Sequence, residues 1–160
     1  MLATKPHYDK TSRLNSFAAT RRHFTMTQLT KPFATYPHTR ICGDLVFISG
    51  QGCRDPQSDA YAGTTIENGS VVSYDIAAQT RGVLKNIERA LASEQLTLAD
   101  LIDVQVFLKT MEDFDQMNQV WNETFSNCQA PTRTTVAVID LPGHNFIEMK
   151  AIASKRNTKG

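Results

Sequence analysis

Two residues in the last third of the chain, Arg133 and Glu148, have side chains that could bind and act on one small molecule. Each lies in a run rich in β-branched residues, 130–139 for the arginine and 146–153 for the glutamate. Between the runs, Leu141-Pro142-Gly143-His144 has the composition of a short loop, so the sequence predicts two strands joined as a hairpin. A guanidinium and a carboxylate would then lie on neighbouring strands.

The register of this hairpin predicts which side chains share a face. If residues 141–144 form the loop, Asp140 faces Asn145 and Arg133 faces Ile152. Because side chains alternate along a strand, one face should carry Arg133, Thr135, Glu148 and Lys150. The opposite face should be apolar, with Val136, Val138, Ile147, Met149, Ala151 and Ala153. Both charges would lie within reach of one ligand, which is the layout of a site. A surface ion pair for Arg133 and a solvated Glu148 are the alternatives.

Composition places the chain among ordinary globular domains. Its 160 residues suffice to bury a core without disulfides or a metal, and 17 basic residues nearly balance 16 acidic ones. The basic residues are scattered, which argues against a nucleic-acid partner. Cys42, Cys53 and Cys128 lack metal-ligand spacing and fit a reducing compartment without disulfides. No apolar stretch approaches the length that spans a membrane.

The first 25 residues differ from the rest of the chain. They carry five basic residues against one acidic residue, Asp9, among Ser and Thr. One interpretation is an organelle transit peptide, which would make the protein mitochondrial. The other, which we favour because no clear amphipathic helix is present, is a translated leader before a true start at Met26, in a cytoplasmic protein. In either case residues 1–25 should be a disordered extension, and residues 26–160 should form a single domain.

Hydrophobic periodicity predicts the elements of that domain. Strands are expected at 39–42, 45–49 and 102–108, and Asn68-Gly69 predicts a hairpin turn between 64–66 and 71–72. A helix capped by Ser73, with Asp75 in its first turn, should run to about Ser93. A second helix capped by Thr110, with Asp113 in a capping box, should bury Phe114, Met117, Trp121 and Phe125.

This order of elements predicts a two-layer α+β domain, in which two helices pack on one face of a mixed β-sheet. The uncovered face would bear Arg133 and Glu148. It would also present apolar side chains that are poorly suited to water, namely Ile139, Phe146 and Ile152. We therefore expect a partner subunit to cover this face.

Several short motifs occur in a characteristic order along the chain. They are Tyr36-Pro37-His38, Phe47-Ile48-Ser49-Gly50-Gln51, Asn86-Ile87, Val106-Phe107-Leu108, Asn118, Pro131-Thr132-Arg133 and Ile147-Glu148-Met149-Lys150-Ala151-Ile152-Ala153. From about Tyr36 to Ala153 the chain resembles the RidA family, also called YjgF. The resemblance implies a chorismate-mutase-like subunit and a homotrimer with three sites at the subunit clefts. It also implies hydrolysis of enamines and imines with no metal and no organic cofactor.

The resemblance assigns roles to individual residues. Arg133 matches the arginine that pairs with the substrate carboxylate, and Glu148 matches the acid that positions the attacking water. The matching substrate-binding positions are Tyr36, which would reach a neighbouring subunit's site, and Ser49, Gly50, Asn118 and Thr135. Ser49 could instead satisfy backbone groups at a strand end, and Asn118 could simply lie on a helix surface.

Two residues depart from the family pattern. Thr135 stands where many members have a cysteine, and Lys150 stands where many have an acidic residue. The run Gly50-Gln51-Gly52-Cys53-Arg54-Asp55-Pro56 resembles the branch of 2-aminomuconate deaminases. Aminomuconate carries two carboxylates, which Arg133 together with Arg54 or Lys150 could neutralise. We favour a surface ion pair of Arg54 with Asp55 or Asp59.

The predicted function is hydrolysis of reactive 2-imino acids or enamines to 2-oxo acids and ammonia. Two alternatives stay open: a 2-aminomuconate deaminase of aromatic catabolism, and a non-catalytic metabolite-binding or regulatory trimer. Arg133 argues against the last, because the family members without deaminase activity include ones that lack this arginine. An RNA-directed role lacks support, since the chain has no basic patch with interleaved aromatic residues.

Overall fold

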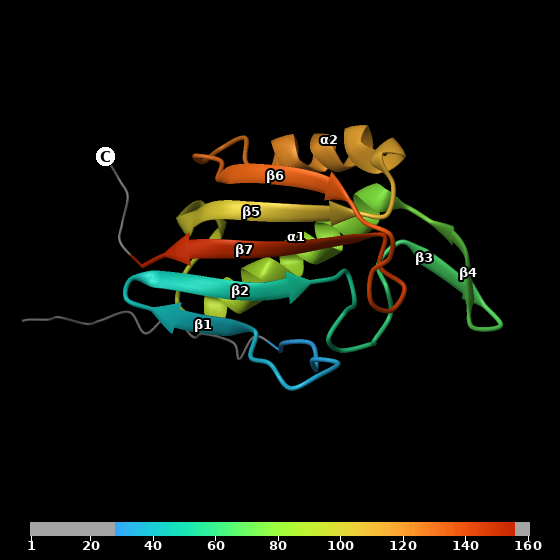
Figure 1. Cartoon of the computed structure of the whole chain (residues 1–160), viewed down its shortest axis with the longest axis horizontal. Helices are drawn as coiled ribbons and strands as arrows, with labels where there is room; N and C mark the ends of the chain where they lie inside the picture. The colour runs from blue at the N-terminus through green and yellow to red at the C-terminus, as the bar shows by residue number, and fades with distance from the viewer. Residues whose placement is uncertain (1–27, 156–160) are drawn as a thin grey trace, which may run out of the picture.

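A five-stranded mixed sheet and two helices form the two layers of the fold (Figure 1). The computed structural model describes residues 28–155; the predicted extension, residues 1–25, lies outside them. The sheet has the order β1-β2-β7-β5-β6, with β1 Thr39–Cys42, β2 Leu45–Gln51, β7 Ile147–Ser154, β5 Leu101–Leu108 and β6 Thr132–Ala137. Helices α1 (Ile76–Ser93) and α2 (Phe114–Thr124) pack on one face, so the predicted two-layer α+β architecture is confirmed.

A separate two-stranded hairpin, β3 (Thr64–Glu67) and β4 (Ser70–Tyr74), extends from one end of the main sheet (Figure 1). Its turn residues Asn68 and Gly69 have φ values of 51° and 79°. Two consecutive positive φ values define the type I′ turn, so the turn predicted at Asn68-Gly69 is confirmed.

The starts of both helices differ from the prediction. Ser73 belongs to β4, and Asp75 caps α1 by accepting a hydrogen bond from the Ala78 amide at 3.0 Å. Thr110 caps a short 3₁₀ turn, Met111–Asp113, and α2 begins only at Phe114. Asp113 makes no capping box, because its carboxylate accepts a hydrogen bond from the Tyr74 hydroxyl at 3.1 Å.

The predicted hairpin between the last two strands is wrong. β5 lies between β6 and β7, pairing in parallel with β6 and antiparallel with β7. The chain passes from β5 through α2 to β6, which is the crossover that parallel pairing requires. Residues 138–146 therefore carry the chain past β5 before it returns as β7.

This arrangement also corrects the predicted faces. Val104 of β5 pairs with both Arg133 and Ala151, and paired residues point to the same side of a sheet. Val104 and Ala151 are buried under the helices, so Arg133 and Thr135 lie on the helix-covered face. Glu148 and Lys150 lie on the uncovered face. The correct part of the prediction is the apolar alternation of β7, whose Ile147, Met149, Ala151 and Ala153 are buried.

The uncovered face is apolar along its middle. It presents Phe47 of β2, Ile152 of β7, Phe107 of β5 and Val136 of β6. Phe47 is 37% exposed and Val136 is 43% exposed. Ile139, which we expected on this face, is fully exposed beyond the end of β6, and Phe146 instead stacks on Tyr74 with ring centroids 3.6 Å apart.

Buried amide side chains fix the loops at one end of the sheet. Asn86 of α1 donates to the carbonyls of Gly52 and Arg54 at 2.8 and 2.9 Å. Asn145 accepts from the Cys53 amide at 2.9 Å and donates to the Pro142 carbonyl at 2.7 Å. Buried backbone groups need such partners, so these amides determine the path of residues 52–54.

We expect Asn86→Ala to lower the free energy of unfolding by about 2–4 kcal/mol, since two carbonyls lose their donor. Urea denaturation followed by circular dichroism measures the change. Asn122→Ala is the matched control, because Asn122 is exposed on α2. Equal stability of the two variants would contradict the role given to Asn86.

None of the helices within residues 28–155 is long and apolar enough to cross a membrane.

Candidate functional site

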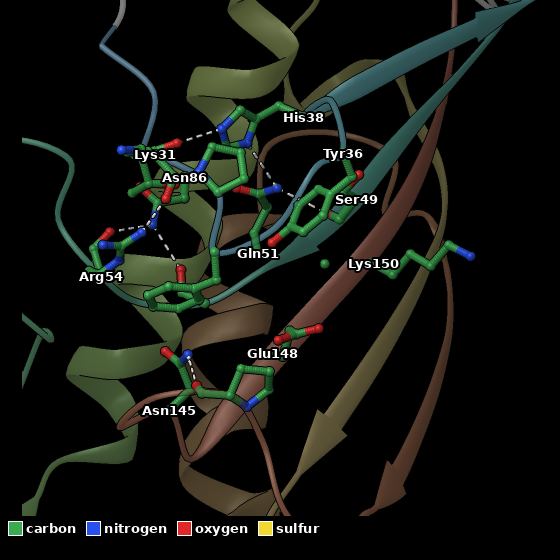
Figure 2. Close-up of a pocket in the computed structure, with 16 residues that line it drawn as sticks. Lys31, Tyr36, His38, Ser49, Gln51, Arg54, Asn86, Asn145, Glu148 and Lys150 are labelled. Atoms are coloured by element: carbon green, nitrogen blue, oxygen red, sulfur yellow. Dashed lines mark hydrogen bonds between the residues drawn. The ribbon is translucent and has the colours of Figure 1, made fainter.

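A pocket of about 420 Å³ opens at the end of the sheet where β2 and β7 meet the chain before β1 (Figure 2). Its walls include four of the residues singled out from the sequence, Tyr36, Ser49, Gly50 and Glu148. Arg54 and Lys150 also line it. Figure 2 shows Tyr36, Ser49 and Gln51 on one side of the pocket and Glu148 and Asn145 on the other.

Glu148 is half-buried in this pocket, and burial raises the pKa of its carboxyl. Within residues 28–155, no hydrogen bond or ion pair engages this carboxylate. A carboxylate with a raised pKa and free lone pairs can accept a proton from water near neutral pH. Glu148 is therefore a candidate general base.

Gly50 leaves the room that Glu148 occupies. A Cβ atom built on Gly50 would overlap the Oε1 atom of Glu148. The close approach arises at a β-bulge, where Ser49 and Gly50 of β2 stand opposite one residue of β7, between the pairs Ile48–Ala151 and Gln51–Met149. A side chain at position 50 would therefore displace the Glu148 carboxylate.

Ser49 and Tyr36 differ in how firmly they are held. The Ser49 hydroxyl donates to the Pro37 carbonyl at 2.7 Å, which matches the backbone role considered from the sequence. Its oxygen lone pairs can still accept a hydrogen bond. Tyr36 lines the pocket with 42% of its surface exposed.

Arg133 lies outside this pocket, against α2. Its Nη2 donates to Asn118 Oδ1 at 2.9 Å, and its guanidinium carbon lies 4.7 Å from the ring centroid of Trp121. Asn118 therefore orients the guanidinium. Burial lowers the pKa of Arg133, which nevertheless keeps its charge at any physiological pH.

Two buried polar atoms at this place have no hydrogen-bond partner in the described part of the chain: Arg133 Nη1 and Thr135 Oγ1. The two residues are next-but-one neighbours on β6 and point to the same side. Unpaired buried polar atoms are costly, so such a pair marks a place where a bound group would supply partners. An anion with acceptor oxygens suits the guanidinium.

The predicted residues thus fall into two groups. Arg133, Thr135 and Asn118 lie on the helix-covered side at the β6 edge, whereas Tyr36, Ser49, Gly50 and Glu148 gather at the pocket between β2 and β7. Within one copy of the chain, the two groups lie on opposite faces of the sheet.

Neither Arg54 nor Lys150 is placed to bind a second carboxylate of the substrate. The two terminal nitrogens of Arg54 are engaged, Nη1 with Asp59 at 2.9 Å and Nη2 with the Lys31 carbonyl. The favoured pairing of Arg54 with Asp59 is confirmed. Figure 2 shows the Lys150 side chain extending away from Glu148.

Sequence reasoning gave no role to three polar residues that shape the pocket, although two of them, Gln51 and Asn86, stand in the motifs quoted above. Gln51 is buried and donates to the Ser49 carbonyl at 2.9 Å, and Asn86 and Asn145 fix the loops described above. Asn86 interrupts the apolar stripe of a helix, which is a usable signal, whereas Asn145 stands in a polar loop with no such contrast. Among residues 28–155, no group of three or more His, Cys, Asp or Glu side chains is placed to hold a metal ion.

Comparison with known proteins places the chain in a family. The family described as Endoribonuclease L-PSP matches residues 26–155. The chain belongs to this family. It is 39% identical over 125 residues to a RutC family protein of Pyrococcus horikoshii, covering 78% of this chain and 90% of that one. The RidA/YjgF membership predicted from the motifs is confirmed.

Other L-PSP family members have more specific names. A Salmonella typhimurium protein named 2-iminobutanoate/2-iminopropanoate deaminase is 32% identical, covering 71% of this chain and 82% of its own length. The structure of the E. coli YjgF gene product matches with a TM-score of 0.70 and 27% identity, over 81% of this chain and 95% of that one. The E. coli TdcF structure with bound serine matches with a TM-score of 0.70 and 26% identity, over the same shares.

The raised pKa of Glu148 gives a prediction for stability. Burial disfavours the ionised carboxylate, so the folded protein loses stability as the pH rises through the folded-state pKa. Glu148→Gln should therefore have a higher melting temperature than the wild type at neutral and alkaline pH. The difference should shrink as the pH falls from the raised folded-state pKa towards the ordinary carboxyl value of 4.5, and it should vanish below that value.

Thermal denaturation across this pH range measures the effect, with the exposed residue Glu67 as control in the variant Glu67→Gln. A Glu148→Gln protein that is less stable than the wild type at neutral pH would show that the carboxylate has a stabilising partner.

Proposed function

We propose that this protein is a hydrolytic deaminase that converts reactive 2-imino acids, and their enamine tautomers, to 2-oxo acids and ammonia. The observation that carries the proposal is the unpartnered, buried Arg133 Nη1 beside the unpartnered Thr135 Oγ1. The carboxylate of an imino acid would satisfy both atoms, because it accepts from the guanidinium and from the threonine hydroxyl. The name of the Salmonella relative and the serine bound to TdcF, a molecule with a carboxylate beside a nitrogen-bearing carbon, agree with this ligand chemistry.

We further propose that each active site forms between two copies of the chain, in a homotrimer. One copy would supply Arg133, Thr135 and Asn118, and the next would supply Glu148 with Gly50, Ser49 and Tyr36. The placement of these groups on opposite faces supports this, since one small ligand cannot contact both within a single copy. The apolar uncovered face around Phe47 and Phe107 supports an interface, because such surface is rarely left in water.

In the proposed reaction, Arg133 binds the substrate carboxylate and thereby fixes the imine carbon. Glu148 accepts a proton from a water molecule as the water oxygen bonds to the C=N carbon, which gives a carbinolamine. Glu148 then returns the proton to the nitrogen. Glu148 next transfers the hydroxyl proton to the amino nitrogen, the C–N bond breaks as the C=O bond forms, and the products are a 2-oxo acid and ammonia. Because imines already hydrolyse in water, most of the acceleration would come from positioning the reactants.

Replacing Arg133 tests the carboxylate contact. Arg133→Ala should lower kcat/KM for 2-iminobutanoate by about 100-fold or more, the effect of losing the charge-assisted hydrogen bond to the substrate carboxylate. Arg133→Lys should recover only part of the lost kcat/KM, because an ammonium lacks the planar guanidinium that Asn118 orients. Ammonia release from freshly generated imine measures the rate. Arg81→Ala, at an exposed arginine on α1 of the helix layer, should match the wild type.

The result that would overturn the enzyme proposal is a folded wild-type protein that does not accelerate imine hydrolysis. A metabolite retained by that protein would then indicate a non-catalytic, ligand-binding role.

Mixing two inactive variants tests whether the site is shared. Arg133→Ala and Glu148→Gln proteins, unfolded and refolded together in equal amounts, should regain activity, because some clefts combine an intact Arg133 group with an intact Glu148 group. Random assembly of a cyclic trimer predicts recovery to about a quarter of the wild-type rate. Each variant refolded alone is the control. If the mixture stays as inactive as its components, the site does not span two copies.

A further inference from the structure

Residues 28–36 form a strap along the outer wall of the pocket. They contain no helix or strand, and Thr30, Lys31, Pro32, Phe33 and Tyr36 all line the pocket. No main-chain ladder joins the strap to the sheet within the described residues. Its position must therefore come from a few side-chain contacts.

Two ends of the strap are held in different ways. At its C-terminal end, the Ser49 hydroxyl holds the Pro37 carbonyl at 2.7 Å, which keeps Tyr36 next to the sheet. Towards its N-terminal end, His38 Nε2 bonds the Thr30 carbonyl at 2.6 Å, and Arg54 Nη2 donates to the Lys31 carbonyl. Arg54 thus contacts the strap from a distant part of the chain, and Leu29, near the start of the strap, also packs against the hydrophobic core.

Arg54 holds the strap through two kinds of contact. Besides its bond to Lys31, its guanidinium carbon lies 4.3 Å from the ring centroid of Phe33, within the range of a cation–π interaction. Its side chain is only 16% exposed, whereas Phe33 is 61% exposed. The Arg54 guanidinium therefore packs against a Phe33 ring that is otherwise largely exposed.

Other residues hold both the guanidinium and the backbone carbonyl of Arg54. Asp59 accepts from its Nη1 at 2.9 Å, and Asn86 of α1 donates to its carbonyl at 2.9 Å. The Arg89 guanidinium in turn donates a hydrogen bond to Asn86 Oδ1 at 2.7 Å. A chain of contacts therefore runs from the core helix through Arg54 to the strap.

We propose that Arg54 is a positioning residue that clamps the strap, and that the clamped strap with Phe33 limits the size of the substrate side chain admitted to the pocket. This inference rests on the proposed deaminase function, whose reacting groups, Arg133 and Glu148, it does not involve. Arg54 lines the pocket, but both of its terminal nitrogens are engaged, by Asp59 and by the Lys31 carbonyl, so it acts through the strap.

Loss of the clamp should change selectivity more than chemistry. In Arg54→Ala the strap can move outwards while Pro37 and Tyr36 stay held by Ser49. The preference in kcat/KM for the imine of 2-aminobutyrate over the bulkier imine of phenylalanine should fall by about fivefold or more, mostly through KM for the larger imine. The kcat for the smaller imine should stay within about twofold of the wild type.

Hydrogen–deuterium exchange of peptides covering residues 28–36 reports the clamp without any substrate. Exchange should become faster in Arg54→Ala, and in Arg54→Lys it should be intermediate, because lysine keeps the charge opposite Asp59 but loses the planar contacts. Phe33→Ala should relax selectivity in the same direction, and this exposed position carries little risk to folding. Arg81→Ala removes an exposed ion pair with Glu123 on the helices and should change neither readout.

Each outcome decides a different point. Unchanged exchange in Arg54→Ala would overturn the clamp. Faster exchange with unchanged selectivity in both Arg54→Ala and Phe33→Ala would overturn the strap as a selectivity wall. A folded wild-type protein that hydrolyses neither imine would refute the deaminase function, and substrate selection by the strap with it, while the exchange data would still report whether Arg54 holds the strap.

Discussion

The position of β5 between β6 and β7 is the constraint on which the site depends. In the pairing of β6 with β5, Arg133 is the partner of Val104, which is buried under the helices. The Arg133 side chain therefore points to the helix layer. β7 pairs antiparallel with the other edge of β5, and its alternation directs Glu148 to the open face. No local change of rotamer can bring the two side chains together. The cation and the carboxylate are thus separated by the sheet itself, and chemistry that uses both must use surfaces of different copies.

Neutral amide side chains provide the buried polar contacts that hold the loops. Charged pairs in the same places would cost more free energy to desolvate. Gln79, Asn86 and Asn145 each satisfy backbone groups from segments distant in sequence. Gln79 accepts from the Phe146 amide at 2.8 Å and so places the start of β7 beside α1. Because these amides bond the loops, Glu148 is not needed to hold them. Burial raises the pKa of Glu148, and its carboxylate has no partner among the described residues.

The sequence allowed much of the fold to be predicted, for identifiable reasons. The strands and the body of each helix followed from periodicity, although both helix starts were misplaced. Asn68-Gly69 specified its turn because few residues tolerate consecutive positive φ values. The pairing of β6 failed because two strands separated by a short loop normally form a hairpin, and nothing local reveals that β5 intervenes. The faces of Arg133 and Thr135 were wrong for the same reason. Pocket residues such as Ser49 and Glu148 were found through motifs, whereas Asn145 and the contacts of Arg54 depend on loop packing that local patterns do not encode.

The sheet order also has a consequence for biosynthesis. β7, the last strand in chain order, is the only one that hydrogen-bonds both β2 and β5 in the described sheet. During translation, the β1–β2 pair and the β5–α2–β6 unit emerge first, but they share no ladder until β7 has been made. Until then both halves present apolar surfaces and unpaired strand edges, the features that invite aggregation and chaperone binding. The nascent chain therefore completes its sheet only after β7 has been made, and a ribosome that stalls before β7 would hold a chain whose two sheet halves share no ladder.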